Sequence, residues 1–115
     1  MGKILIFDPC REDAGILAQA LRSLLGAVRV SLYAPEDVFS EKMPEDVRMA
    51  FFTVTGMYDA EAARKFGALR EDVPMVVVSD SEEYGILSWS LGSCYYLLRP
   101  FGEKELPLAL RHCAV

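Results

Sequence analysis

Short apolar runs alternate with amphipathic segments along the whole chain, and this alternation predicts strands alternating with helices. The run from Met75 to Val78 is continuous and rich in β-branched residues, which is typical of a strand buried on both faces. The predicted strands are Ile4–Phe7, Val28–Tyr33, Arg48–Val54, Met75–Val78 and Tyr95–Leu98. The predicted helices are Arg11–Leu25, Pro35–Lys42, Ala60–Leu69, Ser81–Leu91 and Glu103–Cys113.

Local signals indicate where several helices begin and end. Gly26 follows the leucine stripe of the first helix and is predicted to end it. Asp59 is expected to cap the third helix. Pro107 is poorly placed inside the last helix, because proline is tolerated in the first turn but disrupts later turns. That helix is therefore expected either to start nearer Glu105 or to bend at the proline.

Five strands alternating with five helices predict a doubly wound α/β fold, a three-layer sandwich with helices on both faces of a parallel sheet. We expect the strand order 2-1-3-4-5, the flavodoxin-like arrangement, in one domain spanning residues 1–115. Ligands of such sheets bind at the carboxyl ends of the first and third strands. Asp8 and Thr53 fall at that edge.

Composition and charge argue against several classes of protein. The apolar content of 52% suits a buried two-sided sheet. A formal charge of −5 argues against direct nucleic-acid binding, which needs a basic surface. The apolar runs are too short to span a membrane. Three cysteines without metal-type spacing predict free thiols and a cytoplasmic location.

The cysteines leave one alternative open. Cys94 and Cys113 fall on a neighbouring strand and helix, so a redox pair between them is conceivable. Cys10 belongs to the opposite edge of the sheet. Free cysteine is more commonly buried and behaves as a small apolar residue, and we expect the cysteines of this chain to do so. His112 is the single histidine; in the last turn of a helix it can contact carbonyl groups, and no catalytic role is predicted.

The chain resembles the receiver (CheY-like) domain of bacterial response regulators from end to end. The resemblance is carried by four segments, 3–8 (KILIFD), 49–52 (MAFF), 76–79 (VVVS) and 92–101 (GSCYYLLRPF). It implies a flavodoxin-like fold. It also implies an aspartate after the third strand that accepts a phosphoryl group, and acidic residues after the first strand that help to hold magnesium.

The chain departs from the family pattern at the positions that accept the phosphoryl group and hold magnesium. Thr53 replaces the acceptor aspartate, and a hydroxyl with no base beside it in sequence is a poor nucleophile. Pro9 replaces the second acid, so Asp8 is left as a remnant of the acidic pocket. Asp8 is expected to cap the following helix more readily than to bind metal, since magnesium sites usually combine carboxylates with phosphate. We therefore predict a non-enzymatic chain without cofactor or metal.

Other positions match residues that switch receivers between states. Ser79 matches a hydroxyl residue that contacts the phosphoryl group, although Ser79 and Glu82 also fit a capping box. Tyr96 matches an aromatic switch residue, or is simply a partly buried aromatic. Arg99 stands where receivers carry lysine, and it is expected to pair with Asp8 across the crevice. The resemblance further implies a cis peptide bond before Pro100.

The segments 84–91 and 96–101 resemble receivers whose output is a LytTR-type DNA-binding domain. The departures cluster at the acceptor site, whereas the second half of the chain stays close to the family pattern. The resemblance implies a partner surface formed by the fourth helix, the fifth strand and the fifth helix. Tyr84, Trp89 and Tyr95 are its candidate anchors, for a protein partner or a homodimer.

The sequence thus predicts a degenerate receiver that signals by protein contact without phosphorylation. One alternative is a receiver that accepts phosphate at a rearranged site, in a phosphorelay that controls transcription. Another is a small flavodoxin-like cofactor-binding protein, although residues 8–13 (DPCRED) are acidic and lack a phosphate-binding loop. The sequence leaves open whether an output domain follows residue 115.

Overall fold

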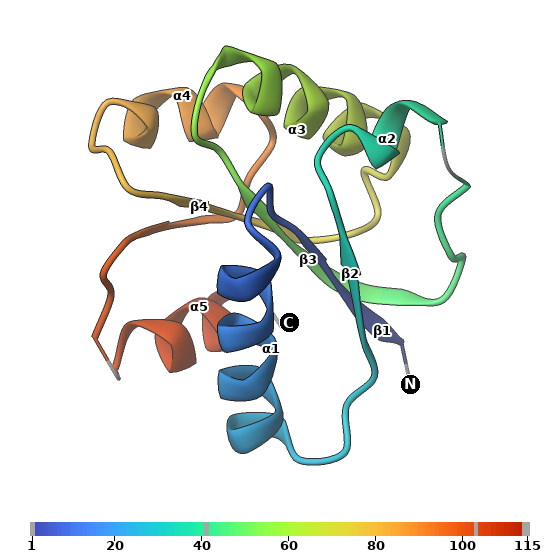
Figure 1. The fold of residues 1–115 in the computed structure, drawn as a ribbon, viewed down its shortest axis with the longest axis vertical. Helices are drawn as coiled ribbons and strands as arrows, with labels where there is room; N and C mark the ends of the chain where they lie inside the picture. Colours follow the sequence, from blue (N-terminus) through green and yellow to red (C-terminus); the bar gives the residue numbers. More distant parts are fainter. Residues whose placement is uncertain (1, 41, 103, 114–115) are drawn as a thin grey trace.

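The computed structural model describes residues 2–40, 42–102 and 104–113. It contains a five-stranded parallel sheet with the order β2-β1-β3-β4-β5 (Figure 1). This topology confirms the predicted fold class. The strands are β1 (Lys3–Phe7), β2 (Val30–Tyr33), β3 (Val47–Thr53), β4 (Met75–Ser79) and β5 (Tyr95–Leu98). The helices are α1 (Arg11–Leu25), α2 (Asp37–Ser40), α3 (Met57–Leu69), α4 (Tyr84–Ser90) and α5 (Glu105–Cys113).

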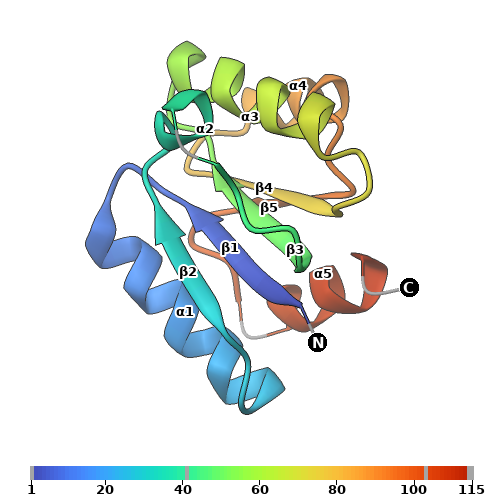
Figure 2. The same ribbon diagram turned by 90° about the vertical axis from the view of Figure 1, so that its right-hand side faces the viewer.

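The helices cover both faces of the sheet. Helices α1 and α5 lie on one face, and α2, α3 and α4 lie on the other (Figures 1 and 2). Alternate strand residues point to opposite faces. Along β1, Ile4 and Ile6 join the core beneath α1 and α5, whereas Leu5 and Phe7 join the core beneath α3. The sheet is therefore buried on both sides, which explains its continuous apolar runs.

Aromatic stacking fills the core on the α3 side. The ring of Phe7 stacks on Phe52 with centroids 4.6 Å apart and on Tyr33 at 5.3 Å, while Phe66 of α3 closes the group at 5.2 Å from Phe7. Phe7 also pairs in register with Tyr33 and Phe52 on its two neighbouring strands. This packing fixes the register of the three strands whose carboxyl ends carry the polar site described below.

Two of the predicted helix ends are confirmed. Gly26 follows α1 with a positive φ of 76°, and its N–H donates to the carbonyl of Arg22 at 2.8 Å. Helix α5 begins at Glu105, so Pro107 falls in its first turn, where its missing N–H costs no helical hydrogen bond.

The starts of two helices were predicted wrongly. Helix α3 begins at Met57, and Asp59 lies inside it, where its carboxylate accepts the Thr55 N–H at 3.0 Å. Helix α4 begins at Tyr84, so Ser79 and Glu82 do not form a capping box. Instead the Ser79 hydroxyl accepts the Ser81 N–H at 3.1 Å. Such local bonds compete with helix formation and delay the helix by a turn. Helix α2 is also shorter than predicted.

Gly67 lies where α3 contacts the end of α4, and replacing it with alanine is expected to destabilise the fold. An added Cβ would meet the Leu91 carbonyl oxygen at 2.7 Å, so backbone must move. Such overpacking costs about 1–3 kcal/mol, which exceeds the gain in helix propensity of up to about 1 kcal/mol. Gly15 of α1 is the matched control, because nothing lies within 4 Å of its added Cβ.

Urea denaturation of the two variants checks this prediction. Gly15→Ala should leave the free energy of unfolding unchanged or raise it, whereas Gly67→Ala should lower it. An equal gain in both variants would show that α3 does not approach Leu91 so closely.

Candidate functional site

Four side chains meet at the carboxyl edge of the sheet because their strands end there. Asp8 follows β1, Thr53 ends β3, Ser79 ends β4 and Arg99 follows β5. Asp8, Thr53 and Ser79 are buried, and Arg99 is mostly covered. Backbone hydrogen bonds hold this edge, including one from the Arg99 N–H to the Ser79 carbonyl at 2.7 Å. The site lies where the strand order reverses, which is where α/β sheets bind ligands.

The guanidinium of Arg99 closes the site over Asp8 and Thr53. The Thr53 hydroxyl donates to Oδ2 of Asp8 at 2.8 Å. Nη2 of Arg99 lies 3.0 Å from both that carboxylate oxygen and the Thr53 hydroxyl. The pairing of Arg99 with Asp8 is as predicted, and the Arg99–Pro100 peptide bond is cis as predicted.

Two further carboxylates form ion pairs with Arg99. Nη1 of Arg99 lies 3.0 Å from Oδ2 of Asp13, and Nε lies 3.6 Å from Oδ1 of Asp80. Neither residue was predicted from the sequence to be part of the site. Asp80 directly follows β4, so the rule that placed Asp8 at this edge applies to it as well. Asp13, in the first turn of α1, carried no comparable signal.

Asp8 is bound at both of its oxygens. Oδ1 accepts the Cys10 N–H at 2.8 Å, while Oδ2 accepts from Thr53 and Arg99. The prediction that Asp8 caps the following helix is wrong, because Cys10 is the N-cap of α1 and Asp8 accepts from the N–H of that residue and from no N–H of the first turn. Asp8 instead stabilises the turn before that helix.

The residues of this site do not fit the magnesium ion that a receiver would hold. Asp8 is the one buried carboxylate among the three, and all three converge on the guanidinium instead of on an open position. Among residues 2–40, 42–102 and 104–113 there is no group of three or more metal-ligating side chains. A divalent cation at this position would have to displace Arg99.

Thr53 does have a carboxylate beside it in space. Its hydroxyl is bonded to Asp8, 45 residues away in sequence, which is the contact that a nucleophile makes with a general base. The same hydroxyl oxygen accepts from Arg99, and Thr53 is only 1% exposed. The hydroxyl is therefore both hydrogen-bonded and covered.

Tyr96 and Ser79 both contact the segment that leads into α4. The phenol of Tyr96 donates to the Ser81 carbonyl, and its ring lies 3.5 Å from where a Cβ on Gly85 would be. Burial raises the pKa of the Tyr96 phenol; the Ser79 hydroxyl lowers it, and the nearby carboxylates of Glu82 and Asp80 raise it further. The ring is partly buried, in agreement with the simpler of its two predicted roles.

The three predicted anchors do not share one face of the sheet. Tyr84 packs on the α3 side and Tyr95 on the α5 side, so β5 lies between them. Trp89 of α4 is 68% exposed, and Ile86, one turn before it, is 87% exposed. The ring of Tyr95 lies 5.5 Å from that of His112. A surface shared by these residues must wrap around β5.

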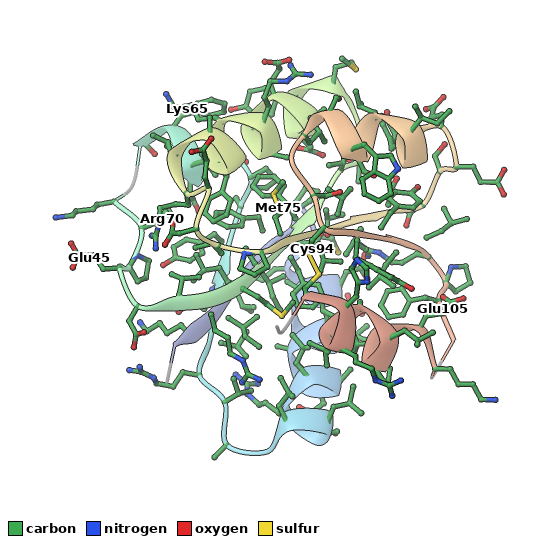
Figure 3. All side chains as sticks on the ribbon, turned by 180° about the vertical axis from the view of Figure 1, so that it is seen from behind. Glu45, Lys65, Arg70, Met75, Cys94 and Glu105 are labelled. Carbon is green, nitrogen blue, oxygen red and sulfur yellow. A yellow bond between two sulfur atoms is a disulfide. The ribbon has the colours of Figure 1, made fainter. Side chains whose placement is uncertain are left out.

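The prediction of free thiols is wrong for Cys94 and Cys113, and the prediction of burial is wrong for Cys10. Cys94 and Cys113 form a disulfide, whose sulfur atoms are drawn in yellow in Figure 3. Cys10 is free but exposed. The strand and helix that were recognised as neighbours do bring the pair together. The argument from free thiols to a reducing compartment is thereby lost.

These observations define a doubly wound α/β protein with a polar site at the point where its strand order reverses.

No family profile matches the chain, and no curated protein matches it. Solved structures do match. A CheY-like receiver domain from Methanospirillum hungatei JF-1 is 20% identical, with a TM-score of 0.74 over 96% of this chain and 91% of that one.

Two further structures extend the comparison. The BeF3-activated receiver domain of DrrB, from Thermotoga maritima, is 17% identical, with a TM-score of 0.78 and coverage of 96% and 95%. A protein of Burkholderia thailandensis E264 assigned to pilus assembly (cpaE) is 18% identical, with a TM-score of 0.84 and coverage of 99% and 98%. The chain therefore has the CheY-like receiver fold, as its sequence predicted.

No helix within the described part of the chain is both long and apolar enough to cross a membrane.

Proposed function

We propose that this chain is a degenerate receiver domain of a two-component response regulator, which acts in the cytoplasm by protein contact and without accepting phosphate. One observation carries the proposal: the Arg99 guanidinium is hydrogen-bonded to both Asp8 and Thr53 at the receiver acceptor position. The protein's own cation thus lies where receivers need a metal ion and a phosphoryl group. The fold supports the receiver assignment.

The electrostatics of the site support this function. Phosphoryl transfer needs cations that can offset the charge of the transferred group. Here the guanidinium is already surrounded by the carboxylates of Asp8, Asp13 and Asp80. These groups together carry a net negative charge, which disfavours a phosphate at the same place. The chain keeps the receiver fold, but its site lacks the electrostatic conditions that phosphoryl transfer needs.

The partner surface would be formed by α4, β5 and α5. Ile86 and Trp89, with exposures of 87% and 68%, are the two most exposed large apolar side chains among the described residues. They lie three residues apart on α4 and so share one side of the helix. Aromatic residues are favoured anchors of protein interfaces. With no phosphate to shift the population, this contact would be constitutive.

A phosphorylatable receiver is the alternative, and the hydrogen bond from Thr53 to Asp8 is the observation that favours it. In that case Asp8 would take the hydroxyl proton as Thr53 attacked the phosphoryl donor. The burial of Thr53 beneath Arg99 weighs against this alternative. Intact-mass spectrometry after incubation with acetyl phosphate and magnesium separates the two, because only the alternative predicts a phosphorylated product.

A flavodoxin-like cofactor binder has less support. The hollow beside the site has a volume of about 260 Å³, at or below the small end for ligand pockets. Its walls are mainly apolar, and its polar lining residues are Asp8, Asp13 and Arg99. A cofactor phosphate there would meet two carboxylates.

Magnesium and beryllofluoride are expected to produce no structural response in the wild-type chain. An NMR titration should show no saturable shifts of Asp8, Thr53 or Ser79 at millimolar magnesium, because Arg99 holds the position of the ion. Restoring the acids in Pro9→Asp with Thr53→Asp should raise magnesium affinity measurably, and adding Arg99→Lys should raise it further. Saturable shifts in the wild type would contradict the proposed function.

A further inference from the structure

The Cys94–Cys113 disulfide fastens the last turn of α5 to the start of β5. Cys94 directly precedes β5, and its N–H donates to the Met75 carbonyl at 2.8 Å, so its backbone is anchored to β4. Cys113 is the last residue of α5 and is buried in the core beneath α1 and α5. The two residues are 19 apart in sequence, with Cα atoms 6.2 Å apart. The bridge therefore joins a fixed point of the sheet to a helix end.

Helix α5 depends on such anchors, because it has only nine residues. Isolated helices shorter than about 12–15 residues are marginal in water. Leu106, Ala109 and Leu110 bury the first two turns against the sheet. Among the last three residues of α5, only Cys113 is buried, while Arg111 and His112 are exposed. Residues 111–113 are therefore kept on the sheet by the disulfide and by the burial of the Cys113 side chain.

The same turn forms half of the proposed partner surface. Tyr95 is next to Cys94 in sequence and His112 is next to Cys113, and their rings lie 5.5 Å apart. These two rings line a shallow hollow together with Leu108, which is 45% exposed, and Arg111. A bridge that fixes Cys94 and Cys113 also fixes this pair of rings and the shape of the hollow.

We propose that the Cys94–Cys113 pair is a thiol–disulfide switch that orders the last turn of α5 and, resting on the proposed function, the α5 half of the partner surface. The bridged form presents the Tyr95–His112 pair in one arrangement. The dithiol form frees the last turn, while Leu106 and Leu110 keep the rest of α5 in place. Cys94 is partly exposed, so one sulfur of the bridge is within reach of small thiols, and this accessibility favours a switch over a permanent link.

The chemistry of the switch is thiol–disulfide exchange with a low-molecular-weight disulfide such as oxidised glutathione. The Cys94 thiolate attacks that disulfide and releases one thiolate, leaving a mixed disulfide on Cys94. The Cys113 thiolate then attacks the Cys94 sulfur and releases the second. The protein loses two electrons and two protons, and two small thiols are formed. Cys94 is the more exposed partner and hence the point of entry.

Hydrogen exchange of the full chain in oxidised and reduced glutathione tests the proposal. Reduction should speed exchange of the amides of residues 111–113 by about tenfold or more, because local stability depends on local contacts, and should leave α1 and α3 unchanged. Cys94→Ser should match the reduced wild type in either buffer, whereas Cys10→Ser should respond as the wild type does. Reduced wild type supplies the same comparison if Cys94→Ser does not fold.

Equal protection of residues 111–113 in both buffers would overturn the switch, as would a bridge that neither forms nor opens across the range of glutathione ratios. The proposed function fails separately. If α5 loosens on reduction and the chain also binds magnesium at Asp8, the switch proposal is supported. The proposal of a receiver that acts without phosphate is contradicted by the same result.

Discussion

Replacing Arg99 with methionine is expected to lower the free energy of unfolding by about 3–5 kcal/mol, the usual cost of removing one partner from a buried ion pair. The side chain of Asp8 is 2% exposed and that of Arg99 is 22% exposed, so water cannot take over the role of the guanidinium. Methionine keeps most of the length of the side chain but provides no donor. Urea denaturation at neutral pH measures the loss.

Two controls isolate the contribution of the buried charge. Arg48 is exposed, so Arg48→Met alters net charge equally and should change stability by less than about 0.5 kcal/mol. Adding Asp8→Asn to Arg99→Met removes the unpaired carboxylate and should restore most of the lost stability. If the double variant is no more stable than Arg99→Met, the cost comes from lost packing and not from the charge of Asp8.

Trp89→Ala is expected to weaken association through the α4–β5–α5 surface by about 2 kcal/mol or more, which is roughly 30-fold in Kd. The stability of the isolated chain should hardly change, because Trp89 is 68% exposed. Sedimentation at tens of micromolar measures self-association of wild type, Trp89→Ala and Tyr95→Ala.

Met57→Ala is the matched control for that experiment. Met57 is 63% exposed, close to the value for Trp89, but it lies on α3, which is not part of the proposed surface. It should associate as the wild type does. A monomeric wild type with no partner bound through this face, or equal losses in Met57→Ala and Trp89→Ala, would remove the α4–β5–α5 surface from the proposal.

The sequence predicted the strands and their order well because both depend on strong, repeated signals. Apolar runs such as 75–78 need burial on two faces, and connection rules leave few arrangements for five of them. The Asp8–Arg99 pair was predictable for a related reason, since strand ends fix where residues meet and opposite charges then pair. Periodicity was sufficient for the strands, whereas the pairing of Arg99 with Asp8 also needed the resemblance to receivers, which placed Arg99 at the position of their lysine.

The errors arose where two local interactions of similar strength compete. Ser79 fits a capping box, yet its hydroxyl bonds to the Ser81 N–H and α4 starts later. Asp59 fits an N-cap, yet its carboxylate is bonded to Thr55 from inside α3. Sequence patterns cannot rank alternatives that differ by about 1 kcal/mol, the typical size of one hydrogen bond or cap. The disulfide was missed because composition favours a free thiol, whereas the distance between two residues decides whether they bond.

The shared fold does not by itself fix a function. Similar structures include the BeF3-activated DrrB receiver and a protein assigned to pilus assembly. Function resides in the site, and here the residues of the site differ from the receiver pattern at positions 9, 53 and 99.

The cation at the Asp8 site belongs to a side chain, so its occupancy does not depend on the concentration of any ion in solution. A metal ion held by carboxylates obeys mass action, so dilution, chelators and the ionic content of the cell all change its occupancy. The guanidinium of Arg99 is covalently part of the chain, and it faces Asp8 whenever the fold is intact. Chelation or dilution therefore cannot empty this position, and the carboxyl edge of the sheet keeps one arrangement across solutions that would change a metal-dependent protein.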